Sequence, residues 1–538
     1  MKNAEVLYNR NFTTGEVDRR MYGSFVEHLG RCVYNGIYQP GHPAADENGF
    51  RNDVKELIRE LGVTAIRYPG GNFVSGYDWK DGIGPKEKRP VRKEMAWNVL
   101  ETNEVGTDEF ARFAADCGTE VLMAVNLGTG TPKEAAELVD YCNTEKGTAW
   151  SEARRGNGSE APHDFKVWCL GNEMDGAWQI NMLKAGEYAR KAREAAKMMK
   201  WMDPSIKLIA CGTCTNEVGH TSYGDWDLAV LEEAYDCIDY LSLHRYFNYD
   251  PAKQLFYPMH EDETDIPFFF RDLRDFLDTI ISACDFVKGK KRSDKTMMIS
   301  FDEYGCNVSP QRPTTVGRFG AVDRSTYPEF STHISRPFRY NDPDRPEAAE
   351  PGCYLNSLAL TSVLMTLMRH ADRVKIGCMT CGLFVIGHDE EHVWKQAGYH
   401  MFELFIKYAS GVSLRPAVEA PDYSVEGYNL NDFNQTPAYE NVPYIEACAS
   451  FDEKKGSAAI FLINRSWEEE LEVALDISGF TGYRPCGHTV LAPEDPYAYN
   501  TYEEQPVKPF EAVDDRWENG RFILKAPKLS FHVIQLTK

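Results

Sequence analysis

The sequence has no long hydrophobic run and no excess of basic residues. No stretch of 18 or more apolar residues occurs, which argues against a transmembrane helix. Lys and Arg together number 59 against 82 Asp and Glu, for a formal net charge of −23. An acidic surface repels nucleic acid and anionic lipid, so neither nucleic acid nor a membrane is expected as a partner. The composition fits a neutral or basic small substrate, or simply a well-solvated surface.

A recognisable secretion signal is also missing. The first residues, MKNAEVLYNR, contain no basic segment followed by an apolar one. The 14 cysteines are therefore expected to be reduced thiols, because disulfides are rare in the cytoplasm. The sequence predicts a cytoplasmic protein.

Two kinds of metal-binding motif occur, neither in a favourable context. The pairs Cys211/Cys214 and Cys378/Cys381 are far apart in sequence, and each lies on or just after a strand-like run, where residues i and i+3 point to opposite faces. We expect buried structural thiols. The segment His388–His392 (HDEEH) has metalloprotease spacing, which requires both histidines on one face of a helix. It lies in a loop-like stretch, so a metalloprotease is a remote alternative that metal in the purified protein would support.

Short apolar runs alternate with helical patterns from about residue 20 to 385. Such runs are typical of strands buried on both faces. The predicted strands are Gly23–Glu27, Thr64–Tyr68, Glu120–Asn126, Lys166–Leu170, Lys207–Cys211, Tyr240–His244, Thr296–Asp302 and Arg373–Cys378. The predicted helices are Phe50–Leu61, Thr107–Cys117 (with Thr107 as N-cap), Thr131–Cys142, Asn181–Met202 and Tyr354–His370. Eight strands alternating with helices predict an α/β fold, a (β/α)8 TIM barrel.

The pattern changes after about residue 400. Short alternating segments separated by turn residues, such as Ser457–Ile463, predict an antiparallel, jelly-roll-like β-sandwich. The first residues are expected to add a strand to it. We therefore divide the chain into a catalytic barrel of residues 19–395 and a sandwich domain of residues 1–18 plus 396–538.

Asn307–Gly352 shows little periodicity of either kind. A functional loop over the active site and a disordered segment are both compatible with its composition.

Catalytic groups of such a barrel lie at the carboxyl ends of its strands. Six predicted strands end in polar residues there, and two of these ends carry the carboxylates Glu173 and Glu303. Glycoside hydrolysis needs such a pair: one carboxylic acid protonates the leaving oxygen, while the other group attacks the sugar or activates water. Either glutamate alone would be interpreted as structural, but the two at one rim favour a glycosidase.

Longer motifs agree with this interpretation. GSFVEHLGRCVYNGIY, RYPGGNFVSGYDWKDGIGP, VWCLGNEMDGAWQI, YLSLHRY, ISFDEYGCNV and ADRVKIGC follow in order over most of residues 20–380. In these motifs the sequence resembles glycoside hydrolase family 51, the α-L-arabinofuranosidases. The resemblance implies a retaining, exo-acting hydrolase that removes terminal α-L-arabinofuranosyl residues from small oligosaccharides or glycosides. It also implies that no metal or organic cofactor is used, and that the protein is a homo-oligomer, often a hexamer.

The resemblance assigns roles to residues of this chain. Glu173 in GNEMDG matches the family's acid/base, and Glu303 in SFDEYG matches its nucleophile. Four further residues match sugar contacts: Glu27, Asn72, Asn172 and Tyr246.

Other rim residues have two interpretations each. His244 is expected to position Glu303, and a satisfied rim histidine is the alternative. Arg67 is expected to pair with a catalytic carboxylate and keep it ionised, although a structural ion pair would look the same in sequence. A platform for the sugar and packing beneath loops are both compatible with Trp79, Tyr77 and Trp178. The platform is favoured for Trp178, which follows Glu173 by only five residues.

The sequence departs from the family at three positions. Cys381 and Phe384 stand where family members carry Gln and Asn, and Tyr304 follows the nucleophile in place of Trp. Losing a polar sugar contact can change specificity. Another furanoside or a xyloside is therefore an alternative substrate. A more distant alternative is that the chain is a non-catalytic carbohydrate-binding protein. The linkage that is cleaved stays open. We also hypothesise that Asn307–Gly352 narrows the pocket for a short or unusual leaving group.

Overall fold

The structure is a computed structural model that describes residues 2–97, 99–176, 178–214, 223–250, 255–258, 269–307, 352–380, 385–425, 428–429, 435–436 and 438–538. Cys381 and Phe384, and Asn307–Gly352 apart from its two end residues, lie outside these ranges. The predictions made for them therefore stay predictions. No helix in the described part of the chain combines the length and the apolar character that crossing a membrane requires.

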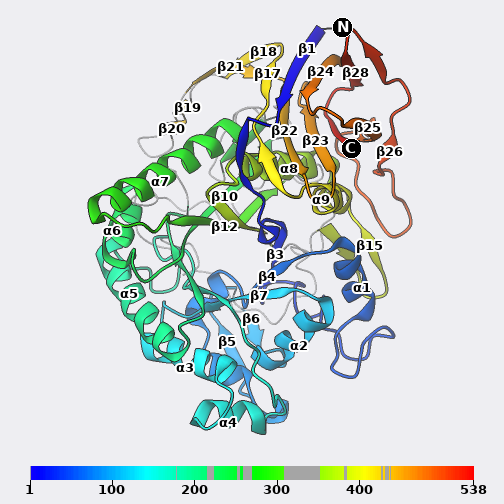
Figure 1. Cartoon of the computed structure of the whole chain (residues 1–538). Coiled ribbons are helices and arrows are strands. Elements are labelled where there is room, and N and C mark those ends of the chain that lie inside the picture. The colour runs from blue at the N-terminus through cyan, green and yellow to red at the C-terminus, as the bar shows by residue number, and fades with distance from the viewer. Residues whose placement is uncertain are drawn as a thin grey trace.

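A closed barrel of eight parallel strands forms the centre of the molecule (Figure 1). Its strands are β3 (Gly23–Phe25), β4 (Ala65–Tyr68), β7 (Glu120–Val125), β8 (Val167–Leu170), β9 (Lys207–Cys211), β10 (Tyr240–Asp250), β12 (Met298–Asn307) and β13 (Val374–Met379). The pairing of β9 with β10 closes the ring, and β11 (Leu255–Pro258) adds an antiparallel edge to β10. Strands such as β4 and β8 are buried along their whole length, which explains their continuous apolar sequences. The predicted TIM barrel is confirmed.

The helices are α1 (Asn52–Leu61), α2 (Thr107–Cys117), α3 (Pro132–Asn143), α4 (Ala149–Gly156), α5 (Ala185–Met202), α6 (Asp225–Ala234), α7 (Phe269–Lys291), α8 (Tyr354–Arg369) and α9 (Ala397–Tyr408). The side chain of Thr131 caps α3 by accepting from the Glu134 N–H. The predicted N-cap of α2 is wrong by one residue. Gly106 is the N-cap and its N–H donates to the Glu109 carboxylate, so Thr107 is already helical.

The carboxyl-terminal part forms two facing sheets. One sheet has the order β17–β1–β24–β28–β27, and the other β2–β16–β22–β23–β29–β25–β26. The strands are β1 (Lys2–Asn9), β2 (Thr13–Glu16), β16 (Val412–Leu414), β17 (Ala417–Glu419), β22 (Ile445–Asp452), β23 (Ser457–Asn464), β24 (Leu471–Gly479), β25 (Arg484–Leu491), β26 (Phe510–Glu511), β27 (Arg516–Glu518), β28 (Arg521–Ala526) and β29 (Ser530–Thr537).

The amino-terminal strand β1 does join this sandwich, as expected. One pair departs from the predicted antiparallel pattern, because β1 runs parallel to β24. These strands are distant in sequence and no hairpin joins them, so no turn dictates their relative direction.

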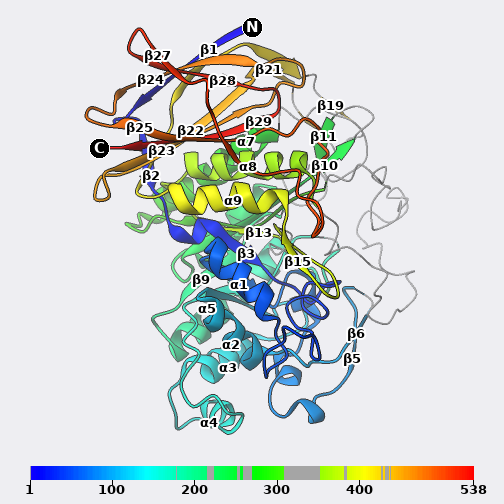
Figure 2. The same ribbon diagram turned by 90° about the vertical axis from the view of Figure 1, so that its right-hand side faces the viewer.

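Helices α8 and α9 lie between the sandwich and the barrel (Figure 2). Phe405 of α9 stacks on Phe461 of β23, with ring centroids 4.4 Å apart, and also on Phe531 of β29. Helix α9 belongs to residues 396–538, the range assigned to the sandwich, although it lies between the sandwich and the barrel. The limits of the two domains therefore stay a prediction. This packing couples the sandwich to the barrel.

Candidate active site

Strand β12 carries a β-bulge where it delivers its acidic residues. Between Ser300 and Glu303 it has one residue more than the paired segment of β10, and the same extra residue appears against β13. A bulge re-aims side chains that would otherwise alternate between faces. It lets the consecutive carboxylates Asp302 and Glu303 both contact one buried cation, Arg67.

Arg67, on β4, links three elements beneath the rim. Its Nη1 lies 2.7 Å from Oε1 of Glu303, and its Nη2 donates to Oδ1 of Asn172 at 2.8 Å. Its Nε lies 3.1 Å from the Asp302 carboxylate. The planar guanidinium thus fixes the positions of three polar side chains at once. A lysine could not do so, because its ammonium group is a single point charge. The predicted pairing of Arg67 with a catalytic carboxylate is confirmed as a contact.

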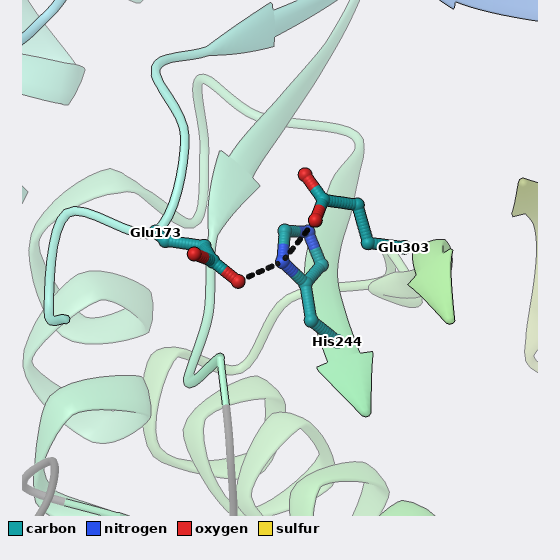
Figure 3. Close-up of side chains that lie close together, drawn as sticks. All are labelled: Glu173, His244 and Glu303. Atoms are coloured by element: carbon teal, nitrogen blue, oxygen red, sulfur yellow. Dashed lines mark hydrogen bonds and ion pairs between the residues drawn. The ribbon is translucent and has the colours of Figure 1, made fainter. Parts of the chain in front are cut away.

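The imidazole of His244, on β10, lies between the carboxylates of Glu173 and Glu303 (Figure 3). Its Nδ1 is 2.8 Å from Oε1 of Glu173 and 3.6 Å from Oε2 of Glu303. On the other side of the ring, Nε2 lies 3.2 Å from the Ser242 hydroxyl. His244 therefore contacts Glu173 more closely than Glu303, whereas the sequence-based prediction favoured Glu303.

The buried charges of this cluster set one another's protonation. Burial disfavours a charged imidazole, but Glu303, Asp302 and Glu173 outweigh it and raise the pKa of His244 to about 10. Burial alone would raise the pKa of Asp302, but the positive charges of Arg67 and His244 outweigh this effect, so its pKa is lowered. Burial and the charge of Glu173 raise the pKa of Glu303, against the opposing effects of His244 and Arg67. At neutral pH, His244 is thus an imidazolium that lies between the side chains of Glu173 and Glu303.

Glu173 follows β8 in a tight, strained turn. It has a left-handed backbone with φ of +43°, which is uncommon for a residue other than glycine and is often found at functional sites. Trp178 donates its Nε1–H to Oε2 of Glu173 at 2.6 Å. The buried Asp175 accepts from the Cys214 N–H at 3.0 Å and so ties this turn to the end of β9. These contacts hold the Glu173 carboxylate at the rim.

Glu27, after β3, lies in a nest of N–H donors. Its Oε1 accepts from the backbone N–H groups of Gly71 and Phe73 and from the Trp97 indole. Burial, together with the Glu303 charge, raises the pKa of Glu27 to about 8, so at neutral pH it is mainly a carboxylic acid that can donate as well as accept. A Cβ on Gly71 would lie 2.9 Å from Oε1 of Glu303, which explains why this position needs glycine.

Two further candidates lie close by. Asn72 begins the short helix η2 (Asn72–Gly76) directly after Gly71 and is half-buried. Tyr246 donates its hydroxyl to Oε2 of Glu303 at 2.7 Å and also contacts the Thr380 hydroxyl at 2.6 Å. The structure therefore brings Glu173, Glu303, Asn172, His244, Tyr246 and Trp178 into one cluster that hydrogen bonds and ion pairs connect, in part through Arg67.

Similarity to known proteins agrees with the glycosidase that the two glutamates predict. Residues 57–265 match the α-L-arabinofuranosidase 1 domain, and residues 328–530 match the α-L-arabinofuranosidase C-terminal domain. An intracellular exo-α-(1→5)-L-arabinofuranosidase 1 of Bacillus subtilis (strain 168) is 39% identical over 545 residues, covering 100% of both chains. The chain belongs to the family 51 α-L-arabinofuranosidases. It is therefore a glycoside hydrolase.

Two other members show the spread of this family. An exo-α-(1→6)-L-arabinofuranosidase of Bifidobacterium longum is 34% identical over 552 residues, covering 100% of this chain and 98% of its own. The solved structure of AbfB, a family 51 α-L-arabinofuranosidase from Bifidobacterium longum, matches with a TM-score of 0.83 and 32% identity over 100% of both chains. The names of the Bacillus subtilis and Bifidobacterium longum relatives thus give different linkages.

Two of the three candidate residues for a sugar platform in this arabinofuranosidase pack against other aromatic side chains. Trp79 is 7% exposed and lies against Tyr141 and Trp150, with ring centroids 5.5 and 5.0 Å away. Tyr77 is half-buried, and its ring packs against Phe73. Trp79 and Tyr77 therefore fit the alternative interpretation, packing beneath loops, whereas Trp178 contacts Glu173 directly.

The segment His388–His392 does not have the helical geometry that a metalloprotease site requires. His388 ends strand β14 (Ile386–His388), which pairs with β15 (Val393–Lys395), so His388–His392 is a hairpin and not a helix. This removes the basis of the metalloprotease alternative. In the described part of the chain, the one group of side chains that could hold a metal ion is Glu173, His244 and Glu303.

Several residues of the site had no clear signal in the sequence. Asp302 precedes Glu303, but strand alternation would have turned it away, and only the bulge explains its contact with Arg67. Trp97 lies in the turn between β5 (Arg92–Glu94) and β6 (Val99–Glu101), a hairpin inserted after β4. No local pattern predicts that its indole reaches Glu27.

Proposed function

We propose that this chain is a retaining, exo-acting α-L-arabinofuranosidase in which Glu173 is the acid/base and Glu303 the nucleophile. The main support for the retaining mechanism is one distance, because carboxylate oxygens of the two residues lie within 4.8 Å of one another. Retaining enzymes need their two carboxyl groups about 5 Å apart, whereas inverting enzymes leave about 6.5–9.5 Å for a water molecule.

In the first step, Glu303 attacks the anomeric carbon while Glu173 protonates the leaving oxygen. Arg67 and Tyr246 donate to the two oxygens of Glu303 and hold it in one orientation for attack. Glu27, Asn72 and Asn172 are proposed to bind the sugar hydroxyls. A glycosyl ester on Glu303 forms and the leaving group departs with the proton of Glu173.

In the second step, Glu173 takes a proton from water, which attacks the ester. After the first step Glu173 is a carboxylate, and the imidazolium of His244 at 2.8 Å stabilises that charge. His244 is therefore proposed as a positioning residue for the acid/base. Trp178 has the same effect through its N–H group.

Small oligosaccharides or glycosides with a terminal α-L-arabinofuranosyl group are the proposed substrates. The names of the relatives support the sugar, and their α-(1→5) and α-(1→6) linkages are the first ones to test. We also propose a cytoplasmic location, which the relatives named as intracellular support. The homo-oligomer implied by the family resemblance stays a prediction, which light scattering would test.

A panel of aryl glycosides tests the assignment: α-L-arabinofuranoside, β-D-galactofuranoside and β-D-xyloside. The arabinofuranoside should turn over fastest. Glu303→Ala and Glu173→Ala should each lower kcat/KM by a factor on the order of 10² or more. Azide should restore turnover to Glu173→Ala by attacking the glycosyl ester, which gives the arabinofuranosyl azide of retained α-configuration. If azide restores turnover to Glu303→Ala, it replaces the missing nucleophile and gives the inverted β-azide. If another sugar wins with the same glutamate dependence, the machinery stands and the substrate assignment is wrong.

Stereochemistry gives an independent test. With methanol as acceptor, a retaining enzyme forms methyl α-L-arabinofuranoside, and proton NMR of the anomeric region distinguishes it from the β-anomer. Formation of the β-anomer would contradict the double displacement.

A further inference from the structure

The three side chains in Figure 3 converge on one point from three barrel strands. Glu173 follows β8, His244 is on β10 and Glu303 is on β12. One ligand atom from each lies within 4.8 Å of the other two, and the two distances from His244 Nδ1 are 2.8 Å to Glu173 and 3.6 Å to Glu303. All three side chains are at most 8% exposed.

The donor set is one that zinc accepts. Zn²⁺ binds imidazole nitrogen and carboxylate oxygen at about 2.0–2.2 Å, and open zinc sites have three protein ligands with a fourth position for water. At these bond lengths, tetrahedral ligand atoms lie about 3.3 Å apart. The distances from His244 Nδ1, 2.8 and 3.6 Å, lie on either side of this value. The two carboxylate oxygens lie within 4.8 Å of each other, and a tetrahedral site needs them about 3.3 Å apart.

The surroundings of His244 also suit a metal ligand. Its Nε2 faces the Ser242 hydroxyl at 3.2 Å and the Asp302 carboxylate at 3.6 Å. A carboxylate or hydroxyl behind an imidazole fixes the ring and raises its basicity toward a metal on the other nitrogen. Once His244 and Glu173 have lost their protons, three carboxylates lie beside the single positive charge of Arg67, so a dication is then electrostatically favoured.

We propose that Zn²⁺ binds the free enzyme through Oε1 of Glu173, Nδ1 of His244 and Oε2 of Glu303, and that it thereby competes with the glycoside. Binding forms three metal–ligand bonds, and the protons on Nδ1 of His244 and on the Glu173 carboxylic acid leave to solvent. Both catalytic carboxylates are then engaged, so neither attack nor protonation can occur. The site is inhibitory and has no part in the reaction. The inhibition rests on the proposed function, whereas the binding does not.

Calorimetric titration of the whole protein tests the binding without using activity. Zn²⁺ should bind, and Glu173→Gln and Glu303→Gln should each weaken it at least tenfold. Mg²⁺ should not bind, because it requires near-octahedral oxygen ligands and dehydrates reluctantly. Cys486→Ser is the matched control, since Cys486 is an exposed thiol far from the site in sequence. Unchanged Zn²⁺ affinity in both glutamate variants, with native circular dichroism, would overturn the proposal.

Kinetics of the unaltered protein give a second test that requires no folded variant. Zn²⁺ should raise KM for an aryl α-L-arabinofuranoside and leave kcat unchanged. Loss of kcat at constant KM, abolished by Cys486→Ser, would instead indicate thiol modification and contradict the inference. If no glycoside is turned over, the proposed function fails, and the titration still decides whether the metal binds.

Discussion

At the scale of single residues, the site depends on donors that each hold one oxygen of a carboxylate proposed to be catalytic. Arg67 and Tyr246 contact different oxygens of Glu303, and Trp178 and His244 contact different oxygens of Glu173. Charge-assisted hydrogen bonds of this kind restrict rotation as well as stabilising charge. Removing one donor should therefore lower the rate without unfolding the protein.

Tyr246→Phe should lower kcat/KM by about 10- to 100-fold, since it removes one donor of about 1.5–3 kcal/mol to a charged group. Steady-state kinetics on the aryl arabinofuranoside would measure the loss. Tyr304→Phe is the matched control, because the buried Tyr304 hydroxyl has no hydrogen-bond partner in the described part of the structure. Equal losses in the two variants would contradict a specific role for Tyr246.

Arg67→Lys should lower kcat/KM by about 10²-fold although it keeps the charge, because one ammonium cannot reach Glu303, Asn172 and Asp302 together. The same assay with Arg155→Lys, a partly exposed surface arginine, should show no change. Full activity in Arg67→Lys would mean that charge alone suffices.

At the scale of elements, loops after neighbouring strands support one another. The Asp175 carboxylate joins the loop after β8 to the loop after β9 through the Cys214 N–H. Burial raises the pKa of Asp175 to about 7. Because the unfolded chain releases this proton near pH 4, the folded state binds more protons between pH 4 and 7. The contribution of Asp175 to the free energy of unfolding should therefore fall as the pH rises through this window and become constant above it.

Asp175→Asn removes the ionisation and keeps an acceptor for the Cys214 N–H. The difference in melting temperature, variant minus unaltered protein, should increase from pH 4 to pH 7 and then stay constant. Each tenfold difference in proton affinity corresponds to about 1.4 kcal/mol. Thermal unfolding at several pH values would measure the trend. Asp236→Asn, with a side chain 78% exposed, should show none of it.

At the scale of the whole molecule, α8 and α9 connect the sandwich to the barrel (Figure 2). The stack of Phe405 on Phe461 and Phe531 is the clearest contact across this layer. The Tyr354 hydroxyl of α8 also donates to the carbonyl oxygens of Leu491 and Leu529. Barrel and sandwich should therefore unfold together.

Phe405→Ala should destabilise the protein by about 3–5 kcal/mol, as expected for loss of a fully buried phenylalanine. Differential scanning calorimetry should show one transition for the unaltered protein and a lower one for the variant. Phe286→Ala, at a side chain 60% exposed, should leave the transition almost unchanged. Two separate transitions in the unaltered protein would contradict the coupling.

Much of this protein was determined by local sequence. All eight barrel strands are recognisable because a parallel strand buried on both faces must be continuously apolar. Polar residues directly after such strands necessarily meet at one rim, which made Glu173 and Glu303 predictable as a pair.

Only the tertiary structure decided how those side chains face one another. The bulge that turns both Asp302 and Glu303 toward Arg67 depends on register with two neighbouring strands, and the contact of His244 with Glu173 joins residues 71 positions apart. The burial of Trp79 and the parallel pairing of β1 with β24 also depend on distant partners. Local periodicity specifies which face of an element is apolar, but it carries no information on which element will cover that face.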